Sequence, residues 1–131
     1  MKVLALDYGS ARTGVAVSDP TGTVARPLEV VKHAATEAGI ARLVELAREE
    51  DVERIIVGLP ITLRGEHGDQ AEETDRFVEL LRAAIDLPVE SFDERFTTKL
   101  ADASDAKAEQ DSVAAAHLLT SYLTWKSARP A

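Results

Sequence analysis

Asp7 is the first residue of this sequence whose position suggests chemistry. It directly follows four apolar residues, Val3–Leu6, and precedes Tyr8 and Gly9. An uninterrupted aliphatic run is typical of a strand buried on both faces, which would put Asp7 at the end of a central strand. A carboxylate is costly where water is scarce, so a bound cation or a cationic neighbour would have to compensate for it. The alternative is that Asp7 caps the turn after the strand, and the strand alone does not decide between the two.

Two further acids, Glu94 and Asp111, also stand where predicted elements begin or end. Glu94 and its neighbour Asp93 follow a predicted strand over residues 87–92. If this strand runs parallel to the first, both bring carboxylates to the same edge of the sheet, where ligand sites of open α/β sheets lie. Asp111 stands at the predicted beginning of the last helix, where it either caps the helix or joins Asp7 and Glu94 in a cluster. The residues by themselves favour the cap.

A cluster of three carboxylates would suit metal-dependent phosphodiester hydrolysis. The acids repel one another, and Mg²⁺ or Mn²⁺, which prefer oxygen ligands, would remove that repulsion. Two such ions, about 3.5–4 Å apart, activate a water and stabilise the leaving oxygen of an in-line attack. Arg12, Arg95 and Lys99 flank the two strand ends, and each is either a contact to a backbone phosphate or a solvated charge.

The composition indicates one globular domain over residues 1–131. Hydrophobic residues make up 45% of the chain, which excludes a disordered protein, and the absence of cysteine excludes disulfides and thiolate metal sites. No apolar run approaches the ~20 residues of a membrane span, and no signal peptide is recognisable, so we expect a cytoplasmic protein. The net charge of -8 argues against a nucleic-acid binder, although divalent cations and a few arginines would reverse the sign locally.

The first two strands are expected to form a hairpin with Asp7 at its mouth. The turn over residues 9–14 has a glycine at each end, and Val15–Val17 resume an apolar strand. Strands joined by a short, Gly-containing loop pair antiparallel. A third strand over residues 23–31 contains Pro27, which favours an edge position because proline cannot donate to a ladder. Actin-like and sugar-kinase-like ATPases also begin with Asp-x-Gly-x-x-x-x-Gly, but their architecture needs two such domains, which leaves an ATPase as the weakest alternative.

Apolar spacing predicts a helix over residues 36–50, a strand over residues 52–60 and a second helix over residues 69–85. A helix between two buried strands forms a βαβ unit, so the strand at 52–60 should run parallel to the first. The apolar stripe of the first helix comprises Ile40, Leu43, Val44 and Ala47. Its solvated face comprises Arg42, Arg48, Glu49 and Glu50.

The second and third helices are expected to be amphipathic as well. The apolar side of the second comprises Phe77, Val78, Leu81, Ala84 and Ile85. Its polar side comprises Glu72, Glu73, Asp75 and Glu79. The last helix is expected to begin near Asp111 and to bury Ala114, Leu118, Tyr122 and Trp125. All three helices would thus cover the sheet with one apolar face each.

Six motifs occur in one order along nearly the whole chain. They are Leu6–Gly9 with Arg12, Gly14–Asp19, Gly22 with Ala25–Leu28, Ile55–Pro60, Asp93–Thr98, and Asp111-Ser112 with Ala114-Ala115. Together they resemble the YqgF family, also called RuvX, the short Holliday-junction-resolvase-like proteins of bacteria. The set is far more specific than the opening Asp-x-Gly alone.

The resemblance implies an α/β protein with an RNase H-like fold: a five-stranded mixed sheet, three antiparallel strands then two parallel ones, flanked by helices. It also implies a metal-dependent nuclease, associated with 5′-end processing of the 16S rRNA precursor and earlier proposed as a Holliday junction resolvase. RNA is then the favoured partner and branched DNA the alternative, for a monomer or a homodimer. A non-catalytic nucleic-acid- or ribosome-binding module with the same fold is a second alternative.

Carried over residue by residue, the acidic triad of the family corresponds to Asp7, Glu94 and Asp111, with two Mg²⁺ or Mn²⁺ ions as cofactors. Strand alternation sends one of Asp93 and Glu94 toward the site and the other away, and we choose Glu94. The sequence departs from the family in two loops that border the expected substrate face. The connector over residues 98–111 is short and acidic where family members have a longer, basic one, and residues 61–65 lack the usual Asn and Asp.

Overall fold

Five strands form one mixed sheet in the computed structural model, which describes residues 1–60, 68–93 and 107–127, the side chains of 107–111 excepted. The strand order is β3-β2-β1-β4-β5. The strands are β1 (Val3–Asp7), β2 (Arg12–Ser18), β3 (Ala25–Lys32), β4 (Arg54–Leu59) and β5 (Val89–Asp93). β2 pairs antiparallel with β1 and β3, whereas β4 pairs parallel with β1 and β5. The expected α/β sheet of three antiparallel and two parallel strands is confirmed.

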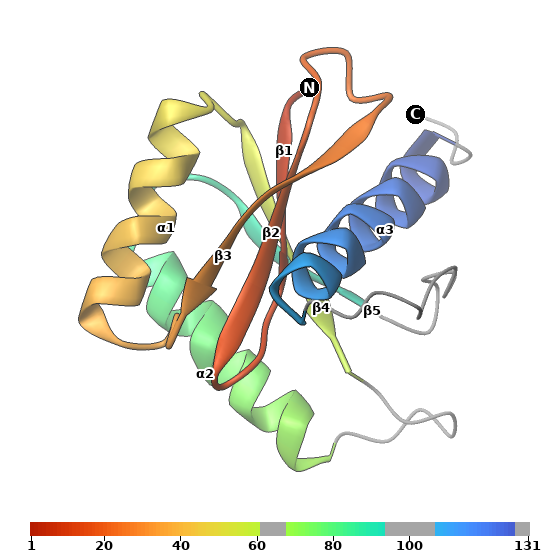
Figure 1. The fold of residues 1–131 in the computed structure, drawn as a ribbon. Coiled ribbons are helices and arrows are strands. Elements are labelled where there is room, and N and C mark those ends of the chain that lie inside the picture. Colours follow the sequence, from red (N-terminus) through yellow and green to blue (C-terminus); the bar gives the residue numbers. More distant parts are fainter. Residues whose placement is uncertain (61–67, 94–106, 128–131) are drawn as a thin grey trace.

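Helices cover both faces of this sheet (Figure 1). In the described residues they are α1 (Glu37–Glu49), α2 (Asp69–Ala84) and α3 (Lys107–Ser127). Side chains alternate between the two faces of a strand, so Leu4 and Leu6 of β1 pack with α1 and α2, and Val3 and Ala5 pack with α3. All four residues are fully buried. β1 is therefore a central strand covered on both faces, as its aliphatic run predicted.

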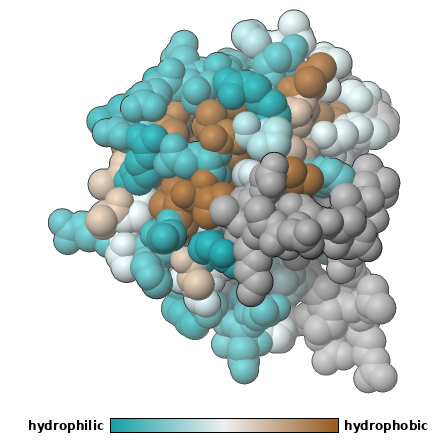
Figure 2. Space-filling view, in the orientation of Figure 1, coloured by the Kyte–Doolittle hydropathy of each residue, from teal (hydrophilic) through white to brown (hydrophobic). Residues whose placement is uncertain are grey.

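β3 forms one edge of the sheet, as Pro27 predicted. Its pairing with β2 shifts register between Val15 and Ala16, so that Ala16 lies opposite Pro27. The bulge places the proline in the ladder of an edge strand, where a missing amide donor is tolerated. Figure 2 shows hydrophobic side chains in the middle of this side of the molecule, surrounded by hydrophilic ones.

Helix α1 begins after Thr36, whose hydroxyl oxygen accepts a hydrogen bond from the Gly39 amide at 3.1 Å. Thr36 is therefore the N-cap of α1, because its side chain satisfies an amide left free in the first turn; the predicted helix over residues 36–50 included it as the first residue. The buried face of α1 includes Leu43 and Ala47, as predicted, and also Leu46.

The expected solvated face of α1 is only partly correct, because two of its charged residues bind strand residues. Arg42 binds both carboxylate oxygens of Glu29 on β3, with its Nε at 2.8 Å and its Nη2 at 2.7 Å. Glu50 pairs with Lys2 at 3.2 Å and with Arg26 at 3.1 Å. A two-point guanidinium–carboxylate contact is among the stronger ion pairs in proteins, so Arg42 joins α1 to the edge strand.

Helix α3 differs from the expectation at its beginning and on its apolar face. It already includes Lys107, so Asp111 lies inside the helix and cannot be its N-cap. Residues 107–110 are Lys-Ala-Glu-Gln, which are good helix formers, and they extend the helix backwards. Ala114 is exposed, as is Ala84 at the end of α2. The buried residues of α3 are Ala115, Ala116, Leu118, Leu119 and Tyr122.

None of the helices in the described part of the chain combines the length and the hydrophobicity that a bilayer-spanning helix requires.

Gly39→Ala is expected to destabilise the protein by about 1–3 kcal/mol, the usual cost of overpacking. An added Cβ would lie 2.4 Å from the carbonyl oxygen of His33 and 2.5 Å from the Cα of Ala34, and these backbone atoms cannot rotate away. Helix propensity alone would make the same substitution stabilising by about 1 kcal/mol. The sign of the change in the free energy of unfolding, measured by urea denaturation, therefore shows which of the two effects is larger. A stabilised variant would contradict the close approach of Gly39 to the backbone of His33 and Ala34.

Candidate active site

Asp7 lies at the end of β1 between two glycines. Its partner on β2 is Gly14, and on β4 the next position in register is Gly58, which follows Val57, the partner of Leu6. The residues directly opposite the half-buried Asp7 on both neighbouring strands are therefore glycines without side chains. By alternation this carboxylate lies on the α3 face. A carboxylate supplies oxygen ligands of the kind that a hard divalent cation prefers.

Tyr8 joins this strand end to α2. Its ring stacks on Phe77 with centroids 4.4 Å apart and planes at 20°. Its hydroxyl donates a hydrogen bond to Glu73 Oε2 at 2.8 Å. Burial, followed by the hydrogen bond to Glu73 and the charge of that carboxylate, raises the pKa of Tyr8 to about 12. Tyr8 is thus a neutral donor that is held at two points, next to Asp7 in the chain.

A pocket of about 230 Å³ lies beyond the end of β1, against the first turns of α2. Its lining residues are Asp7, Tyr8, Gly9, Ser10, Pro60, Gln70, Glu73 and Thr74. The position beyond the carboxyl ends of β1 and β4 is where open α/β sheets place their ligands.

The turn between β1 and β2 brings the backbone of Arg12 close to Gly9, which lines this pocket. At Gly9 an added Cβ would lie 2.5 Å from the carbonyl oxygen of Arg12, so the two ends of the turn approach each other as only glycine allows. The Gly9 amide also donates to Oγ1 of the buried Thr13 at 3.3 Å. Arg12, predicted to contact nucleic acid, accordingly lies at the beginning of β2, half-exposed.

The second predicted carboxylate position lies at the end of β5. Phe92 packs in the cluster under α3, where its ring meets Tyr122 edge-on with centroids 5.5 Å apart. Asp93, one residue later and paired with Leu59, consequently belongs to the opposite face of the sheet. Asp93 therefore does not share the face of Asp7. Glu94 lies outside the described residues, as do Arg95 and Lys99.

The backbone of α3 brings Asp111 toward the Asp7 edge. In its later turns, the hydroxyl of Tyr122 donates to Glu90 at 2.8 Å and accepts from Arg54 at 3.3 Å, at the beginnings of β5 and β4. Asp111 lies three turns earlier, about 16 Å along the helix. Asp7 lies four residues beyond the level of Arg54, which pairs with Val3, about 13 Å along the strand. The two backbones thus approach the same end of the molecule.

Of the three predicted metal ligands, only Asp7 has a described side chain. Among the described residues, no group of three His, Cys, Asp or Glu lies close enough to hold a metal ion. Asp111 is described by its backbone alone, and Glu94 not at all. The metal site and the roles of the three acids therefore stay predictions.

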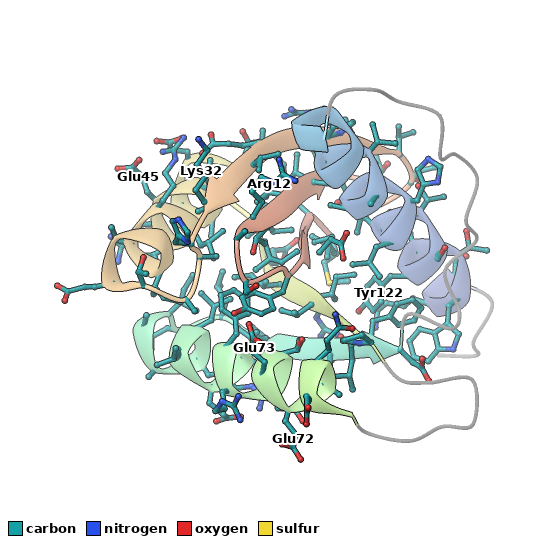
Figure 3. All side chains as sticks on the ribbon, turned by 60° about the horizontal axis from the view of Figure 1, so that its bottom comes forward. Arg12, Lys32, Glu45, Glu72, Glu73 and Tyr122 are labelled. Carbon is teal, nitrogen blue, oxygen red and sulfur yellow. The ribbon has the colours of Figure 1, made fainter. Side chains whose placement is uncertain are left out.

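Glu73 is the pocket residue that sequence reasoning missed. It was assigned with Glu72 to the solvent side of α2, but it is half-buried and bound to Tyr8. Figure 3 shows Glu73 directed toward the centre of the view and Glu72 directed outward. The signal was the spacing, because Glu73 precedes Phe77 by four residues and so lies on the same side of the helix.

A family model described as "RuvX: Holliday junction resolvase" matches residues 1–125 of the chain. Bacterial relatives named "Putative pre-16S rRNA nuclease" are similar over nearly the whole length. The protein of Chloroflexus aurantiacus is 42% identical over 137 residues, which cover 98% of this chain and 90% of the relative. That of Symbiobacterium thermophilum is 40% identical over 139 residues, which cover 99% and 96%.

Solved structures of two resolvases have the same fold. RuvC of T. thermophilus in complex with a Holliday junction substrate superposes with a TM-score of 0.62 at 20% identity, covering 97% of this chain and 96% of RuvC. The Fowlpox virus resolvase with Holliday junction DNA gives 0.54 at 13% identity, covering 96% and 99%. At such identities the likeness concerns the fold alone, and it confirms the expected RNase H-like architecture.

Glu73→Gln is expected to lower the pKa of Tyr8 from about 12 part of the way toward 10, because the charge of Glu73 is lost while burial remains. Carbon NMR of the two tyrosine rings across alkaline pH measures each pKa. Glu72→Gln, which removes an exposed charge one residue away, is the matched control. Equal shifts in both variants would contradict the assignment of Glu73 as the partner of Tyr8.

The same interaction has a consequence for stability at high pH. Because the folded-state pKa of Tyr8 lies above its ordinary value of 10, folding favours the protonated phenol. Its contribution to stability is fully present below pH 10 and is lost as the pH rises through about 12. Unfolding curves should show a smaller loss over this interval for Tyr8→Phe than for the wild type; identical losses would contradict the assignment.

Proposed function

Because the chain belongs to the RuvX family, we propose that it is a metal-dependent nuclease that hydrolyses phosphodiester bonds in the 5′-end processing of the 16S rRNA precursor. The name of the relatives supports the substrate. The observation that carries the chemistry is the position of the Asp7 carboxylate at the end of a buried strand, opposite Gly14 on β2 and one residue beyond the last pair of β1 with β4, Leu6 and Val57. Processing of ribosomal RNA would take place in the cytoplasm.

We assign Asp7, Glu94 and Asp111 as the residues that would hold two Mg²⁺ or Mn²⁺ ions. When bound, these ions would supply activation of a water and stabilisation of the leaving oxygen. The part of the protein itself is to hold the carboxylates in place. For Asp7 this support comes from the β1 ladder and from the anchoring of Tyr8 to α2, which limit the movement of the strand end.

Strand alternation supports Glu94 over Asp93. Glu90 and Phe92 of β5 contact Tyr122 of α3, so even-numbered residues of this strand lie on the face of Asp7. Asp93, an odd-numbered residue, lies on the opposite face, so we propose Glu94 as the acid of this strand end. Asp111 is supported by the run of α3, whose first turns extend toward the Asp7 edge.

Cleavage of branched DNA is the second candidate, and the description of the family model favours it. Resolving a junction symmetrically requires one active site for each strand, and therefore a homodimer. The ribosomal RNA substrate makes no such demand, so a monomer would suffice for it.

Asp7→Asn is expected to lower the rate of Mn²⁺- or Mg²⁺-dependent cleavage by at least about 100-fold, because even an outer partner of a metal ligand is usually worth 10–100-fold. The measurement is a gel assay on matched RNA, single-stranded DNA and junction substrates, with each metal and with a chelator. Asp86→Asn is the control, since Asp86 is exposed and follows α2 at the opposite end of the sheet.

Three outcomes would change the proposal. Equal activity of wild type and Asp7→Asn would refute the nuclease assignment. Binding by the wild type without cleavage in any metal would indicate a non-catalytic nucleic-acid-binding module. Cleavage of the junction in preference to RNA would indicate the resolvase.

A further inference from the structure

Lys32 is a cation of this acidic protein that has no carboxylate partner among the described residues. Most of the described arginines, and Lys2, form ion pairs with glutamates. These pairs are Lys2–Glu50, Arg26–Glu50, Arg42–Glu29, Arg54–Glu90 and Arg82–Glu79. Arg48, Arg76 and Lys126 lack such a pair as well and are exposed like Lys32, but they lie on helices. Lys32 lies at the end of a strand, opposite an arginine.

The register of β2 and β3 places Lys32 directly across from Arg12. Val31, which precedes Lys32, and Val15, three residues after Arg12, pack under α1 and α2. Alternation therefore puts Arg12 and Lys32 together on the other face of the sheet, which is also the face of Asp7. Figure 3 shows the two residues next to each other on adjacent strands. Like charges in opposed cross-strand positions repel each other, and a bound anion would relieve that repulsion.

This pair of cations lies just beyond the end of β1. Asp7 pairs with Gly14, so Arg12 is two residues past the level of Asp7, and Lys32 is one strand farther from it. Strand spacing and residue rise put the Cα of Lys32 about 12 Å from that of Asp7. A polyanion bound at the Asp7 edge would therefore reach Lys32 within a few residues of its backbone.

The backbone that carries Lys32 is held in place on its far side. The amide of His33 donates to the carbonyl of Ala11 at 3.0 Å, and the Thr36 hydroxyl donates to the carbonyl of His33 at 2.7 Å. Gly39 packs directly against the same carbonyl. A contact that is already ordered loses less entropy on binding.

We infer that Arg12 and Lys32 form a phosphate-binding ledge that holds the backbone of the RNA substrate a few nucleotides from the bond to be cut. The inference rests on the proposed function for its ligand. Contacts of this kind position a nucleic acid without reading its sequence. They are also needed here, because a protein with a net charge of -8 otherwise repels RNA at long range.

The test is the salt dependence of RNA binding in the presence of a chelator, so that cleavage plays no part. Fluorescence anisotropy with a labelled single-stranded RNA gives the affinity of wild type, Lys32→Gln and Lys32→Arg at several salt concentrations. Losing one phosphate contact flattens the log–log slope by about 0.7. Over a fourfold rise in salt, the wild type should therefore lose about 2.5-fold more affinity than Lys32→Gln, and Lys32→Arg should behave as the wild type.

Lys126→Gln is the matched control, because Lys126 is an exposed cation in the last turn of α3 that forms no ion pair with the described part of the chain. An unchanged slope for Lys32→Gln, an equal change for both glutamine variants, or no RNA binding by the wild type would each overturn the ledge. The cleavage assay separates the two proposals. If the wild type cleaves RNA and Lys32→Gln has the salt-dependence slope of the wild type, only the ledge is refuted. If the wild type does not cleave RNA and Lys32→Gln has a flatter slope, only the nuclease proposal is refuted.

Discussion

The structure depends on a central strand that is buried along its length and ends in a charge. Val3–Leu6 have no exposed surface, and the ladders to β2 and β4 hold the strand from both sides. Asp7 is the first residue of β1 that the side chains of the two helical layers do not bury completely. The same burial that makes β1 rigid therefore also confines the carboxylate to one place, and the residues opposite it on both neighbouring strands are glycines.

Each layer of the protein contributes to this end of the sheet in a different way. α2 anchors the residue after Asp7, because Tyr8 stacks on Phe77 and donates to Glu73. α3 crosses the other face with its later turns tied to β4 and β5 through Tyr122, which directs its first turns toward Asp7. The β2–β3 pair extends past β1 and carries Arg12 and Lys32. Elements far apart in the chain thus converge at one edge.

The distribution of charge follows a similar division. Glutamates form ion pairs with five of the described cations, and the pair of Arg42 with Glu29 joins helix α1 to strand β3. Such half-exposed pairs contribute modestly to stability, but they remove positive charge from the surface away from the candidate site. A strongly acidic protein can therefore still carry cations at one edge of its sheet, so its net charge alone does not decide against a polyanionic partner.

Much of the fold was predictable from the sequence because local patterns determine it. The aliphatic run of β1, the short glycine turn and the βαβ alternation all depend on residues close together in the chain, and all are confirmed. The family could also be recognised from the sequence, because each of its motifs is a short local pattern and the motifs occur in one order along the chain. The position of Asp7 at a strand end was likewise readable from its neighbours alone.

Tertiary structure decided everything that depends on how two distant segments meet. The hydrogen bond of Glu73 to Tyr8, the contact of Arg42 with β3 and the opposition of Arg12 and Lys32 each require a helix rotation or a strand register, which periodicity does not specify to within one residue. Helix α3 begins about one turn earlier than predicted, and this difference alone rules out Asp111 as its N-cap. Sequence determined which groups were present and on which elements; packing determined which of them face one another, because contact energy depends on geometry in space and not on spacing along the chain.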